Sequence, residues 1–176
     1  MESAAKAAGH PIHQQLIAFP LGLLATGVVF DVVERVTDND EFTTASYLMI
    51  AAGILTGLLA AMFGAIDWLA IPAGTRAKRV GAVHGLGNVV VVGLFAVSWL
   101  LRVDEPGHVP GSLALTLAVV AAALAGVTGW LGGELVDRLG VGVDPDAHLD
   151  APASYETHVR LGRAAAADAS RTARRS

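Results

Sequence analysis

The chain has 176 residues, of which 53% are hydrophobic and 16% are charged, and its mean hydropathy is +0.55. A water-soluble domain cannot hide so large an apolar surplus, so the composition excludes an ordinary globular protein and indicates an integral membrane protein whose first partner is the lipid bilayer. The absence of cysteine excludes disulfides, iron–sulfur clusters and thiolate metal sites within the chain. The net charge of −4, without a basic stripe, argues against nucleic-acid binding.

Four long apolar segments are predicted to be transmembrane helices, because about 20 apolar residues cross a bilayer. They run from Gln14 to Phe30, from Phe42 to Ile66, from Val80 to Leu101 and from Ser112 to Gly133. In the first helix, Pro11 suits the first turn and Pro20 is expected to introduce a kink. Short connections between successive helices favour antiparallel neighbours, so the expected fold class is an all-α, up-down-up-down four-helix membrane bundle.

The chain is expected to divide into a transmembrane domain, residues 10–143, and a mobile tail, residues 144–176. The tail is rich in Asp, Ala, Pro, Ser and Arg and has little to bury, so it is expected to be largely disordered apart from one short helix near Tyr155 to Ala167.

The orientation follows from the basic residues, because positively charged loops resist translocation. Arg76, Lys78 and Arg79 lie between the second and third helices, whereas the other two loops are mainly acidic. We therefore expect the basic loop and both termini to be cytoplasmic.

This topology brings polar residues from all four helices to the cytoplasmic side. They are His10, His13 and Gln14 on the first helix, Asp67 on the second, His84 and Asn88 on the third and Glu134 on the fourth. His10 and His13 are three residues apart and His84 and Asn88 four apart, so each pair is expected to share one face of its helix.

Three interpretations of this cluster remain open from the sequence. His13 and His84 could be the axial ligands of a haem b used in electron transfer, with Asn88 lining the site. His10, His13, Asp67 and His84 could instead hold a single zinc or iron ion. The third interpretation is a non-catalytic membrane scaffold or accessory subunit, whose polar residues only anchor helix ends in the interfacial zone.

Two groups of residues are expected to lie outside this site. Asp31 and Arg102 are at the external helix ends, where a pair between them is predicted to be an ordinary surface contact that contributes little. His108, in a loop, and His148 and His158, in the tail, are expected to lie away from the bundle core. No hydrolytic, phosphate-binding or nucleophile motif is present, so the chain is not expected to be an enzyme by itself.

Several short motifs occur in order along the membrane part of the chain. They are His10-Pro11-Ile12-His13, Phe19-Pro20-Leu21-Gly22, Phe30-Asp31, Gly64-Ala65-Ile66-Asp67-Trp68, His84-Gly85-Leu86-Gly87-Asn88, Gly129-Trp130-Leu131-Gly132-Gly133-Glu134-Leu135 and Gly140-Val141-Gly142-Val143. Together they resemble the bacterial four-helix membrane proteins grouped as the domain of unknown function 2231. The resemblance implies a four-span fold in the bacterial inner membrane and no established activity. Some relatives look like neighbours or fusion partners of Rieske-type iron–sulfur modules, which implies electron transfer and a redox partner on another chain.

Overall fold

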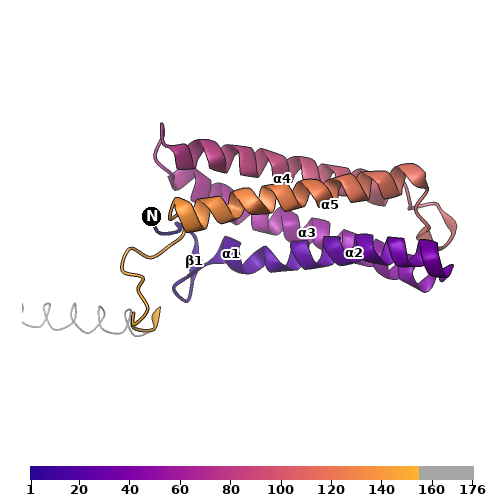
Figure 1. The fold of residues 1–176 in the computed structure, drawn as a ribbon, viewed down its shortest axis with the longest axis horizontal. Coiled ribbons are helices and arrows are strands. Elements are labelled where there is room, and N and C mark those ends of the chain that lie inside the picture. The colour runs from indigo at the N-terminus through magenta and orange to yellow at the C-terminus, as the bar shows by residue number, and fades with distance from the viewer. Residues whose placement is uncertain (155–176) are drawn as a thin grey trace, which may run out of the picture.

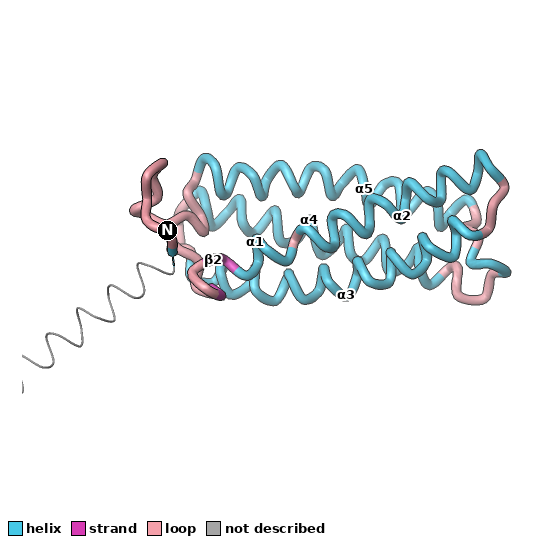
Figure 2. The backbone as a smooth tube through the Cα atoms, turned by 90° about the horizontal axis from the view of Figure 1, so that it is seen from below, coloured by secondary structure: helices cyan, strands magenta, loops and turns pink. Residues whose placement is uncertain are grey.

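The computed structural model describes residues 1–154, and these form an elongated bundle of four helical spans (Figure 1). The spans are α1 (Ile12–Leu16) followed by α2 (Ala18–Thr37), then α3 (Glu41–Ala70), α4 (Arg76–Leu100) and α5 (Ser112–Gly133), which continues into the π-helical turn η2 (Glu134–Arg138). Each span is long and apolar enough to cross a membrane. Figure 2 shows the spans running side by side with loops at both ends, so the predicted all-α four-helix membrane bundle is confirmed.

The helices pack around a ring in which α2 contacts α3, α3 contacts α4, α4 contacts α5, and α5 contacts α2. The buried core consists of Leu24, Ile50, Val91, Phe95, Ala118 and Ala121. Close approach depends on Gly53, because a Cβ built there would lie 2.6 Å from the Leu24 side chain of the neighbouring helix. Most large apolar side chains point outward, as expected for helices that face lipid tails.

The first span is interrupted earlier than the sequence suggested. Pro20 was expected to kink the helix, and the helix is interrupted only at Ile17, between α1 and α2, where the backbone keeps α-helical angles (φ −61°, ψ −21°). Pro20 has no N–H to donate to the carbonyl of Leu16, and its ring crowds that carbonyl, so the hydrogen-bond ladder fails on the preceding turn. α1 contacts α3 as well as α2.

A small hairpin precedes α1 and corrects one prediction. Strands β1 (Lys6–Ala7) and β2 (His10–Pro11) pair antiparallel, and Ala8 and Gly9 between them have positive φ angles, as a two-residue hairpin turn requires. His10 was expected to open the first helix and share a face with His13. It lies in β2 instead, where its side chain is exposed. Its Nδ1 is 3.1 Å from the carbonyl oxygen of Ala8, two residues earlier.

The two ends of the bundle differ in their polar residues. We call the end with His13, His84 and Asp67 the histidine end, and the opposite end, with Asp31 and Arg102, the arginine end. The 3-10 turn η1 (Pro106–His108) lies in the loop that joins α4 to α5 at the arginine end. Residues 144–153 form turns and irregular chain, and the helix expected near Tyr155 to Ala167 lies outside the described residues.

Candidate functional site

His13 projects from α1 onto the backbone of α3. Its Nδ1 lies 2.8 Å from the carbonyl oxygen of Ala60, and the side chain is partly buried. Gly64, one turn further along α3, makes room for the ring: a Cβ at that position would lie 2.9 Å from both Cε1 and Nδ1 of His13. The ring therefore occupies the space that a side chain at position 64 would need.

His84 makes the equivalent contact between the other two spans. Its Nδ1 lies 2.8 Å from the carbonyl oxygen of Thr128 in α5. A Cβ at Gly132, one turn further along α5, would lie 3.1 Å from Cε1 of His84. Each histidine is thus fixed by a helix carbonyl and packed beside a glycine of the helix that it contacts.

The two imidazoles meet each other across the bundle. Their ring centroids are 6.4 Å apart and their planes are perpendicular, at 89°. A carbonyl oxygen only accepts hydrogen bonds, so both rings donate from Nδ1, and Nε2 is the accepting nitrogen of each neutral imidazole. A backbone carbonyl is also the common partner of the second ring nitrogen in metal-ligating histidines.

Asn88 and Thr128 hold the His84 ring from the side. The Asn88 amide donates to the His84 carbonyl at 2.9 Å and also lies 3.3 Å from Nε2 of His84. Thr128 is buried, and its hydroxyl donates to Oδ1 of Asn88 at 3.0 Å. Asn88 was expected at this site, whereas Thr128 was missed because a lone threonine in an apolar helix gives no signal beyond its polarity.

The remaining members of the predicted cluster have other partners. Oδ1 of Asp67 accepts hydrogen bonds from the Ser3 hydroxyl and from the backbone N–H groups of Ala4 and Ala5. Glu134 pairs with Arg76 at 2.6 Å. Within residues 1–154, no three His, Asp or Glu side chains come together as a metal site. The structure therefore brings His13 and His84 together but does not gather His10 or Asp67 with them.

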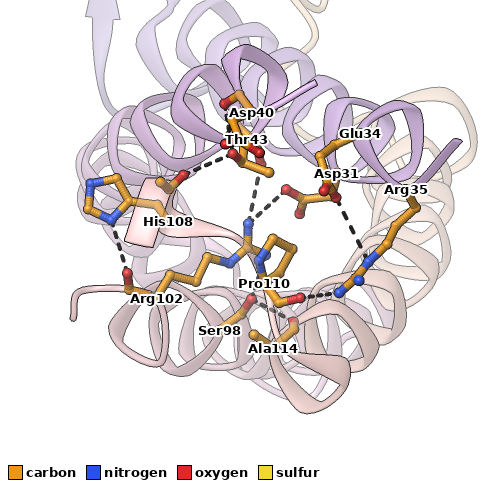
Figure 3. A network of polar contacts seen from close by, with 12 residues as sticks. Asp31, Glu34, Arg35, Asp40, Thr43, Ser98, Arg102, His108, Pro110 and Ala114 are labelled. Carbon is orange, nitrogen blue, oxygen red and sulfur yellow. Dashed lines mark hydrogen bonds and ion pairs between the residues drawn. The ribbon is translucent and has the colours of Figure 1, made fainter. Parts of the chain in front are cut away.

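Arg102 is the centre of a second polar network, at the arginine end (Figure 3). Its Nη1 donates to Oδ1 of Asp31 at 2.8 Å and to the Ser46 hydroxyl at 3.3 Å. Its Nη2 donates to the Ser98 hydroxyl at 2.9 Å, and Ser98 in turn donates to the carbonyl of Ala114 at 2.7 Å. The guanidinium thereby connects all four spans.

The prediction that Asp31 and Arg102 make an ordinary surface contact was wrong. Both side chains are 0% exposed. The chain turns after α4 ends at Leu100, and this turn directs Arg102 back between the helices. One sequence signal could have indicated this site. Ser98 lies four residues before Arg102, on the same side of the chain, and Ser46 places a second hydroxyl near the start of α3.

Hydrogen bonds and one ring stack hold the loop between α4 and α5 over this network. The Thr43 hydroxyl donates to the carbonyl of Gly107 at 2.8 Å, and Arg35 donates to the carbonyl of Pro110. The His108 ring stacks on Tyr47 with centroids 3.8 Å apart, and its Nδ1 is 2.9 Å from the Arg102 carbonyl. His108 lies in this loop, outside the buried core, and these contacts place it over the network.

Comparison with known proteins gave one match. Residues 9–145 match the family model described as a predicted membrane protein, DUF2231, and this range contains all four spans. Neither the comparison with curated proteins nor that with solved structures found a match.

Proposed function

The chain belongs to the DUF2231 family of predicted membrane proteins, and for this bundle we propose a redox function: His13 and His84 hold a haem b iron and the protein transfers electrons within the membrane. The observation that carries the proposal is the adjacent pair of imidazoles, whose ring centroids are 6.4 Å apart with planes at 89°. Imidazole nitrogens bind metals at about 2.0–2.1 Å, so two rings on one metal have centres roughly 6 Å apart. The observed spacing fits this value.

The number of ligands favours haem over a bare ion. A structural zinc site needs four ligands, and the described residues supply no third His, Asp or Glu beside this pair. A haem iron takes four nitrogens from its own porphyrin and needs only two axial ligands. Within this proposal, haem supplies the one-electron chemistry, and the bonds to Ala60 and Thr128 orient the two Nε2 atoms. Asn88 lies beside the His84 ring and adjusts the position and basicity of that ring as a ligand.

The proposal includes a topology and a partner. The basic loop with Arg76, Lys78 and Arg79 joins two spans at the histidine end, which supports a cytoplasmic position for that end in the bacterial inner membrane. The chain has no cysteine, so any iron–sulfur centre that exchanges electrons with it belongs to another protein.

An optical spectrum of the purified protein tests the function. Purification from cells supplied with haem precursor should yield a coloured protein whose Soret band shifts on reduction, with one haem per chain by extraction. A colourless preparation with no stoichiometric metal, even after incubation with haemin, contradicts the redox function.

A second candidate function is a non-catalytic scaffold or accessory subunit. It is favoured by the hydrogen bonds themselves, because His13 joins α1 to α3 and His84 joins α4 to α5 without any cofactor. A scaffold predicts that loss of either imidazole lowers stability and leaves the absorption spectrum and metal content of the protein unchanged.

A further inference from the structure

The segment that precedes the first span lies across the histidine end of the bundle. We call residues 1–11 the N-terminal strap; it contains the β1–β2 hairpin and leads directly into α1. Oδ1 of Asp67, in the last turn of α3, accepts a hydrogen bond from the Ser3 hydroxyl at 2.7 Å. The same oxygen accepts from the backbone N–H groups of Ala4 at 2.8 Å and of Ala5 at 3.2 Å. One carboxylate oxygen therefore holds three consecutive residues of the strap.

The strap is also joined to the chain that follows α5 and η2. The backbone carbonyl of Met1 accepts from the N–H of Gly142 at 2.8 Å. Gly142 has a φ of +80°, and a Cβ there would lie 2.5 Å from Nε2 of Gln14, so this turn approaches α1 as closely as a glycine allows. Figure 1 shows the N-terminus beside the end of α5 and β1 beside the start of α1. The strap thus links the end of α3 to the turn beyond α5.

These attachments surround His13. The residue before it, Ile12, donates its N–H to the Ala5 carbonyl at 2.9 Å. The residue after it packs against the glycine turn beyond η2. Asp67 lies three residues, or nearly one helical turn, beyond Gly64, the glycine that makes room for the His13 ring. The strap is therefore fastened on each side of the histidine that it precedes.

Little apolar burial holds the strap in place. Within residues 1–11, Ser3 alone is buried, at 7% exposed, and its side chain is polar. A segment that is held mainly by hydrogen bonds near the surface opens at a lower free energy than the helices beside it. The bonds to Asp67 have a carboxylate as acceptor, and such bonds are the stronger kind. Asp67 is therefore the residue that should set how often the strap opens.

We propose that the N-terminal strap is a latch, held closed by Asp67, that controls access from water to the His13–His84 pair. When the bonds to Asp67 break, the strap leaves the bundle end while the four spans stay packed, because the core residues belong to the spans alone. That the open latch admits haem rests on the proposed function, whereas the latch itself needs no cofactor.

Cysteine labelling tests the latch, because the chain has no cysteine of its own. Single-cysteine variants in nanodiscs are treated with a maleimide that cannot cross lipid. Ser3→Cys reports on the strap, and Gln14→Cys, at a half-buried position next to His13, reports on access to the histidines. Both should be labelled slowly. Ala7→Cys, exposed at the hairpin, should be labelled quickly and is the control for the reagent.

Asp67→Ala should speed the labelling of both slow reporters by roughly 10- to 100-fold, the effect of losing one hydrogen bond to a charged group. Ala118→Cys, in the core and 0% exposed, should stay unlabelled in the same background, which shows that the bundle remains folded. Glu134→Ala is the matched control, because this carboxylate lies at the same end but pairs with an arginine of α4. It should change none of the rates.

Asp67→Asn keeps an acceptor oxygen without the charge, so its labelling rates should lie between those of the wild type and Asp67→Ala. The latch is overturned if Ser3→Cys is labelled as fast as Ala7→Cys while Asp67 is intact, or if Asp67→Ala changes neither slow rate. Faster labelling at position 3 but not at position 14 would show a strap that does not control access to the histidines, and would overturn the proposal too. None of these rates depends on haem, so a colourless protein contradicts the redox function without deciding this test.

Discussion

The imidazole of His13 meets that of His84 edge to face, with ring centroids 6.4 Å apart, although the two residues come from the first and third spans. Each ring has its Nδ1 against a helix carbonyl, and Nε2 of His84 lies 3.3 Å from the Asn88 amide. Four predictions follow from this pair, from its glycine neighbours, from the ion pair at the other end and from the basic loop.

His13→Ala and His84→Ala should each abolish haem binding, because loss of one axial imidazole opens the iron to other ligands. Asn88→Ala should still bind haem, but with an affinity lowered by on the order of 10- to 100-fold, as expected for a residue that only orients a ligand. Absorption spectra and haem titration measure both effects.

His148→Ala is the matched control, since His148 is exposed beyond η2 and should not change the spectrum. His108→Ala should keep the spectrum as well, but it removes the stack on Tyr47 and should lower stability by about 1 kcal/mol. Normal haem content in both His13→Ala and His84→Ala would exclude the pair as axial ligands.

Gly64→Ala should displace the His13 ring, because the added Cβ would lie 2.9 Å from two ring atoms. The expected cost is about 1–3 kcal/mol of stability, typical of overpacking, together with a shifted or broadened absorption band. Gly132→Ala should do the same to His84 more weakly, since its Cβ would be 3.1 Å away.

Gly129→Ala is the control for these changes, because nothing lies within 4 Å of its Cβ position. It should leave the spectrum unchanged and match the wild type in stability or slightly exceed it, as alanine is the better helix former. Equal effects of alanine at positions 64 and 129 would show that the ring contact is not what matters.

Asp31→Leu or Arg102→Met should destabilise the bundle by about 3–5 kcal/mol, because each change leaves a buried charge without its partner. The double variant, Asp31→Leu with Arg102→Met, should lose much less than the sum, since apolar residues of similar volume can replace a buried ion pair. Thermal unfolding in nanodiscs measures the cycle. Additive losses would mean that the two side chains do not interact.

The topology is tested by reporter fusions that are active only outside the cytoplasm. Fusions within residues 38–40 or after Asp104 should be active, and fusions after Thr75 or at Ser176 should be silent, because the basic loop stays inside. Activity of the Ser176 fusion would reverse the orientation and place the histidine end outside.

The four spans could be predicted from the sequence alone, because their length and apolar character are properties of continuous segments. The order of the helices then put His13, His84 and Asn88 at one end without any knowledge of packing. The ordered motifs likewise identified the family that the comparison confirmed.

Only the tertiary structure decided which polar residues contact each other. In a bilayer the lipid is as apolar as the core, so a membrane helix has little amphipathic pattern to show which face turns inward. Hydropathy therefore could not separate His10, which lies in a hairpin, from His13, which packs on Gly64. Nor could it show that the chain after Leu100 turns Arg102 inward onto Asp31, because that depends on the rotation of two helices and the path of one loop.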